Sequence, residues 1–172
     1  MKAKRDMEKK RPVYSDLRKT NEGELPYGGR SRAEMQRLAN EDSTVAEELA
    51  ASLSHLAVDE KIAGRPQSAL LAEGQAIQVR RKWAATHPTI ANHLSESLMN
   101  YAFDLSEQER QADAAEATEE SIALQRQLLE TSTNSDSNPS ATKILADSLE
   151  NLSVHLSLQG RAEDALRAQA EE

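Results

Sequence analysis

Apolar residues recur every three or four positions in three separate stretches of the chain. The last stretch carries them at Leu145, Leu149, Leu152 and Leu156. Steps of four, three and four residues place these leucines on one face of an α-helix. The same spacing predicts a helix from about Thr44 to Ala63, with Ser43 as its N-cap, and another from about Thr89 to Gln108. We call these three predicted helices the A helices.

A turn and a second helix, the B helix, are expected to follow each A helix. Gly64 and Gly160 stand where the first and third A helices end, and glycine adopts the positive φ of such an end at little cost. Pro66 then falls in the first turn of a B helix, where its missing N–H does no harm. In the second repeat Glu109 occupies the glycine position, so we expect either a strained left-handed residue or a different turn.

The B helices carry small residues seven positions apart, which allow the two helices of a hairpin to approach closely. These are Ala69 and Ala76 in the first B helix and Ala114 and Ser121 in the second. Larger residues follow them, and we expect Trp83 among these to lie in the core.

The helix pairs are also related in sequence. Superimposing Arg65, Arg110 and Arg161 gives periods of 45 and 51 residues, and 12 of the 28 positions in 94–121 are identical to those in 145–172. Typical residue frequencies would give about two identities by chance. Periods of this length indicate a stack of supersecondary units. We expect the three arginines to be turn residues that pair with nearby carboxylates.

The pattern predicts an all-α fold of antiparallel helix hairpins, with about two and a half repeats at 43–88, 89–139 and 140–172. Leucines and a small residue on each A helix, glycine at the turn and alanines seven apart on each B helix resemble the tetratricopeptide repeat. The 45-residue period, with THPTIANHLSESLMNYA joining one B helix to the next A helix, resembles the long repeats of kinesin light chains. The resemblance implies a right-handed α-solenoid that binds peptides and proteins without catalysis.

Charge divides the chain into a basic tail and an acidic body. Residues 1–30 contain nine Lys/Arg and five Asp/Glu, a net charge of +4, so the other 142 residues carry −12 of the total of −8. The tail mixes charge with Pro, Gly and Asn and shows no helical period, so we expect disorder, with a solvated tail favoured over a nuclear address or a contact with anionic surfaces. Ser31 and Glu34 form a candidate capping box for a short helix that carries Met35 and Leu38 and covers the first repeat.

Composition argues against several classes of protein. The chain has no cysteine, no apolar stretch of signal-peptide type in its first thirty residues and no run of 18 apolar residues. We therefore predict an intracellular protein that does not cross a membrane, cytoplasmic or, if the basic tail is an address, nuclear. Its four histidines lack metal-site spacing, and neither a P-loop nor a G-x-G-x-x-G motif occurs, so we expect no catalytic residue, metal or cofactor. The acidic body argues against nucleic-acid binding.

In the resembling family, A-helix residues off the packing stripe line a concave groove for the partner. By register, eight residues of repeats 2 and 3 fall there: Glu96, Met99, Asn100, Phe103, Asp147, Glu150, Asn151 and Val154. In repeat 1, Ser54, Val58 and Ile62 fall there, with His55 equivalent to the two asparagines. In relatives, an asparagine at this position holds the backbone of an extended peptide. The lysines that clamp a carboxylate in chaperone-binding members lack counterparts here, apart from Lys61 nearby.

An apolar groove edged by carboxylates should prefer a basic, partly apolar segment of a partner. Two alternatives stay open. Phe103 and Met99 could instead pack against a neighbouring helix while the acidic residues are merely solvated. The chain could also be an assembly element, or a fragment of a larger signalling protein, that docks or forms a homo-oligomer through its open C-terminal edge, because the third B helix ends at Glu172 and repeat arrays normally need about three units and a cap.

Overall fold

The computed structural model describes residues 32–131 and 139–171, and all the regular secondary structure in these ranges is helical. The predicted tail at 1–30 lies outside these ranges, and so does Ser31, the predicted cap of the short helix that carries Met35. The helices are α2 (Arg32–Leu38), α3 (Ser43–Ile62), α4 (Pro66–Ala84), α5 (Pro88–Glu107), α6 (Gln111–Thr131), α7 (Pro139–Leu158) and α8 (Ala162–Glu171). The predicted A helices correspond to α3, α5 and α7, and the B helices to α4, α6 and α8.

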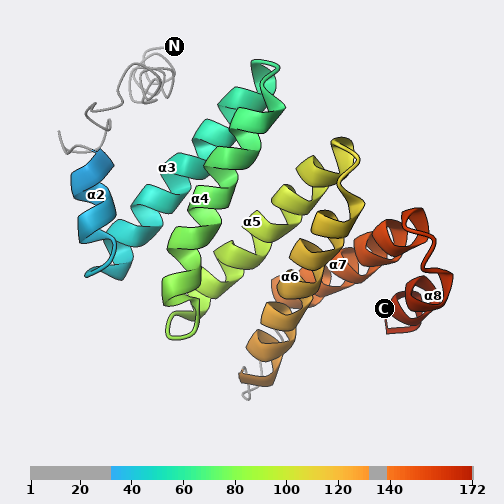
Figure 1. The fold of residues 1–172 in the computed structure, drawn as a ribbon. Coiled ribbons are helices and arrows are strands. Elements are labelled where there is room, and N and C mark those ends of the chain that lie inside the picture. The colour runs from blue at the N-terminus through green and yellow to red at the C-terminus, as the bar shows by residue number, and fades with distance from the viewer. Residues whose placement is uncertain (1–31, 132–138, 172) are drawn as a thin grey trace, which may run out of the picture.

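Each helix packs against the next one along the chain, so the fold is a row of three helix pairs, α3–α4, α5–α6 and α7–α8 (Figure 1). The short helix α2 lies at the N-terminal end of this row against α3. Contacts also join α5 to α7, so A helices of successive pairs meet directly.

The A helices form where leucine and small apolar residues supply one continuous buried stripe. Leu53, Leu98 and Leu149 are equivalent in the three repeats, and all are buried. The small residues of the B helices are buried as predicted, which lets each B helix approach its A helix closely. The predicted cap of α3 is wrong by one residue, because Ser43 is already helical and Asp42 is the N-cap, its carboxylate accepting from the N–H of Thr44 at 2.8 Å.

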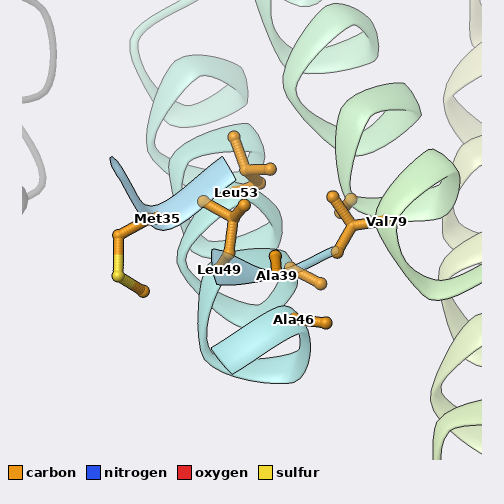
Figure 2. Close-up of a cluster of buried hydrophobic side chains, with 8 residues drawn as sticks. Met35, Ala39, Ala46, Leu49, Leu53 and Val79 are labelled. Atoms are coloured by element: carbon orange, nitrogen blue, oxygen red, sulfur yellow. The ribbon is translucent and has the colours of Figure 1, made fainter. Parts of the chain in front are cut away.

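Helix α2 covers one end of the row. Figure 2 shows buried residues in one cluster: Met35 from α2, Ala39 from the turn that follows α2, Ala46, Leu49 and Leu53 from α3, and Val79 from α4. Trp83 packs against this cluster and is half-buried, and its indole Nε1 donates to the carbonyl of Ala39 at 2.9 Å. Its predicted place in the core is therefore confirmed only in part.

The turns within the pairs repeat one backbone geometry. Gly64 and Gly160 have φ of 71° and 74°, and Glu109 adopts the same left-handed conformation at 61°. The second repeat therefore keeps the turn and accepts the strain of a non-glycine residue.

The arginines that follow these turns pair as predicted, Arg65 with Glu60, Arg110 with Asp113 and Arg161 with Asp164.

The second and third pairs are joined by the segment between α6 and α7. Thr131 is the last residue of α6 and Pro139 is the first residue of α7. Residues 132–138 lie outside the described ranges.

Candidate partner-binding surface

One face of the row exposes large apolar side chains at equivalent positions of the three A helices. Val58 on α3 corresponds to Phe103 on α5 and to Val154 on α7, at the repeat spacings of 45 and 51 residues. Their exposed fractions are 57%, 59% and 50%, whereas Leu53, Leu98 and Leu149 on the same three helices are buried. We call the surface around these three residues the A-helix surface.

The part of this surface between α3 and α5 is hollowed. A cavity of about 220 Å³ is lined by Ser54, Ala57, Val58 and Lys61 of α3, by Glu73 of α4, and by Asn100, Phe103 and Asp104 of α5. Two of the residues predicted by register in repeat 2, Asn100 and Phe103, thus lie in the same hollow as Val58 from repeat 1.

The other predicted residues divide between exposed and packed positions. Exposed side chains are Glu96 on α5 and Asp147, Glu150, Asn151 and Val154 on α7, together with Ile62 on α3. Met99 is half-buried, and the Ser148 hydroxyl of α7 donates to its sulfur at 3.0 Å. The packing alternative therefore describes Met99, whereas Phe103 remains open to solvent.

Lys61 at the rim is held by the chain itself. Its ammonium hydrogen-bonds Asp104, lies 2.8 Å from Glu107 and sits 4.6 Å from the centre of the Phe103 ring. Burial disfavours the charged form, but the hydrogen bonds to the two carboxylates outweigh it and raise the pKa of Lys61 above its ordinary value. A lysine held in this way is occupied by carboxylates of α5, which makes it a poor clamp for a partner's carboxylate.

A layer of hydrogen-bonded polar side chains, which we did not predict from the sequence, lies beneath the A-helix surface. The guanidinium of Arg80 on α4 is buried and reaches between α3 and α5, where it donates to Glu47 at 2.7 Å and to Ser97 at 2.6 Å. It also donates to Ser54 at 3.1 Å, and the Ser54 hydroxyl in turn donates to Glu73 at 3.2 Å. Three helices are thus joined by one hydrogen-bonded chain of side chains.

A signal for this layer was present in the sequence. Glu73 and Arg80 follow Ala69 and Ala76 at helical spacing, so two charged residues occupy the stripe that faces the core. One repeat later Arg80 is replaced by Gln125 and Glu47 by Asn92. The Gln125 side chain is fully buried, and neither of its polar atoms has a hydrogen-bond partner within the described part of the chain.

Cavities also recur on the side of the B helices. One of about 300 Å³ lies between α4 and α6 around Tyr101 and Arg110, and its repeat equivalent of about 310 Å³ lies around Leu152 and Arg161. A neighbouring hollow of about 570 Å³ is lined in part by Tyr101 and the exposed Leu71. These cavities make the B-helix side the competing candidate for a binding surface.

Within residues 32–131 and 139–171 there is no cluster of three or more His, Cys, Asp or Glu side chains arranged to hold a metal ion. None of the helices described is long and apolar enough to cross a membrane. No family model matches the chain, and no curated protein matches it in sequence.

Proposed function

We propose that the chain is a tetratricopeptide-like interaction module, without catalysis of its own, that binds a basic, partly apolar segment of a partner protein on the A-helix surface. In this proposal the row of pairs continues as a right-handed solenoid and the A-helix surface is its concave side. The observation that carries the proposal is the exposure of Val58, Phe103 and Val154 at one repeat position. Single exposed apolar residues are common on protein surfaces, but equivalent ones on neighbouring helices make an apolar strip.

The charges around the strip support a basic partner segment. Asn100 supplies both a donor and an acceptor for a peptide backbone. Exposed carboxylates, Glu96 on α5 and Asp147 and Glu150 on α7, edge the strip, and Lys61 is already neutralised by α5. A basic segment with apolar side chains therefore complements the surface better than an acidic one.

The test compares capture of proteins from cell lysate by the wild type, by Phe103→Asp and by Leu71→Asp. Both variants place a charge at an exposed apolar position, with 59% and 66% exposure, but Leu71 lies on the B-helix side. We expect Phe103→Asp to lower partner recovery at least about tenfold, which corresponds to about 1.4 kcal/mol, and Leu71→Asp to leave it unchanged. The reverse pattern would assign binding to the B-helix cavities, and equal helicity of the variants by circular dichroism is the control.

A specific observation favours a second function, self-association through α8. Leu166 is 66% exposed, although its repeat equivalents Leu70 and Ala115 are 6% and 2% exposed because the following A helix covers them. An A-type helix from a second copy would cover Leu166 in the same way. Sedimentation of the wild type and Leu166→Lys tests this: a concentration-dependent dimer lost in the variant supports it, and a monomer at all concentrations rejects it.

A further inference from the structure

Glu73 is the least satisfied charge beneath the A-helix surface. Glu73 is only 4% exposed. The one hydrogen bond that its carboxylate makes with the described residues comes from the Ser54 hydroxyl at 3.2 Å. No ion pair joins it to any cation in that part of the chain. A buried carboxylate normally needs a cation or several hydrogen bonds to offset the loss of water.

The two cations that share this hydrogen-bonded chain or this cavity with Glu73 are bound by other carboxylates. Arg80 reaches Glu73 only through Ser54, because its guanidinium is bound by Glu47. Lys61, across the cavity, is bound by two carboxylates of α5.

The local charge is therefore negative. Four carboxylates surround this part of the surface, against two cations: Glu47, Glu73, Asp104 and Glu107 against Lys61 and Arg80.

The cavity above Glu73 has the shape and lining for a long cationic side chain. Its volume of about 220 Å³ lies below the usual range of drug-sized sites, so it suits one side chain. Val58 and Phe103 give apolar walls for an aliphatic stem, while Glu73 and Asp104 give acceptors for a charged head. The Phe103 ring already receives one ammonium, that of Lys61, on its face.

We propose that this cavity is a recognition pocket for a single arginine or lysine side chain of the partner, with Glu73 as the residue that determines specificity. The inference rests on the proposed function and adds the chemistry of one anchor residue. The pocket belongs to the first junction alone, because one repeat later Thr118 replaces Glu73 and Val154 replaces Phe103. The partner segment accordingly places its basic side chain between α3 and α5 and an apolar one between α5 and α7.

The test is an NMR titration of the isotope-labelled chain with n-butylguanidinium, and with neutral n-butylurea as the matched probe. We expect n-butylguanidinium to shift the amides of Ala57, Asn100 and Phe103, and to bind at least about tenfold more tightly than n-butylurea. Glu73→Gln should remove this preference, since the amide oxygen still accepts from Ser54 but carries no charge. Glu116→Gln, the same change at an exposed position of α6, should preserve it.

Phe103→Leu gives a second variant that keeps the apolar wall and removes the ring. We expect it to weaken n-butylguanidinium about threefold and to leave n-butylurea unchanged. Equal binding of the two probes, or equal effects of Glu73→Gln and Glu116→Gln, would overturn the proposal that this cavity recognises a cationic side chain. That result is distinguishable from failure of the proposed function, which appears as unchanged protein capture by Phe103→Asp.

Discussion

The turn at Glu109 offers a test of the repeat that depends on backbone geometry alone. Glu109 has φ of 61°, close to the 71° and 74° of the equivalent Gly64 and Gly160. Its side chain is exposed and makes no hydrogen bond or ion pair with the described residues. Replacing it with glycine therefore removes strain and sacrifices no contact.

The magnitude follows from two opposing terms. A left-handed non-glycine residue costs about 1–2 kcal/mol, and glycine returns about 0.5–1 kcal/mol of this because the unfolded chain gains freedom. Glu109→Gly should thus stabilise the fold by about 0.5–1 kcal/mol, or raise Tm by about 1–4 °C in a chain of this size. Gly64→Ala should destabilise it by about 1 kcal/mol, and purely through the backbone, since no atom lies within 4 Å of the added Cβ.

The assay is urea denaturation followed by circular dichroism, with Glu109→Ala as the matched control. Alanine removes the same side chain and keeps the strain, so its midpoint should stay near that of the wild type. If Glu109→Gly were no more stable than Glu109→Ala, the turn would not carry the strain that we assign to it.

Three further predictions concern the polar groups inside the row. Arg80→Ala should cost about 3 kcal/mol, because it removes the donor to the buried Ser97 hydroxyl and leaves Glu47 with His93 Nδ1 at 3.0 Å in place of the guanidinium, whereas Arg81→Ala, at the exposed neighbouring position, should cost less than about 1 kcal/mol; equal midpoints would refute the buried network. Gln125→Met should raise the denaturation midpoint by the equivalent of about 1 kcal/mol, since it removes a buried amide without partners, and a loss of stability would show that the amide is satisfied in solution. Burial lowers the pKa of His155 below its ordinary value, so its contribution to stability is present above pH 6.5 and decreases as the pH falls through that value towards the lowered folded pKa. His155→Gln should therefore flatten the decrease in stability between pH 7.5 and 5. An unchanged pH profile in His155→Gln would contradict the assignment.

The helices and turns could be predicted because local signals specify them. The four leucines at 145–156 share one face only if the segment is helical, so burial of that face favours a helix. Gly64 and Gly160 end helices because glycine adopts a positive φ at little cost. The start of α3 was wrong by one residue because Asp42 and Ser43 are both good caps, and only the backbone path decides between them.

The position of Arg80 and Glu73 on the core-facing stripe gave a signal for the polar layer, but their partners could not be predicted because they come from distant parts of the chain. A charge on a helix is normally interpreted as solvent-exposed, but Arg80 finds Glu47 across 33 residues and Ser54 across 26. Register put Asn100 and Phe103 on one face of a helix, and the structure shows that both line one hollow, but register left open whether Met99 packs and did not name Ser148 of α7 as its partner. Positions on a face follow from periodicity, whereas contacts between side chains of neighbouring helices depend on tertiary packing.

The most direct test of the account is to select peptides from a random library against the chain and to map the tightest one by NMR. We expect a peptide with a basic and an apolar residue that shifts amides of α3, α5 and α7 around Val58, Phe103 and Val154, and that Phe103→Asp no longer binds. A selected peptide that maps to the cavity around Tyr101 and Leu71, or a selection that enriches no peptide, would contradict it.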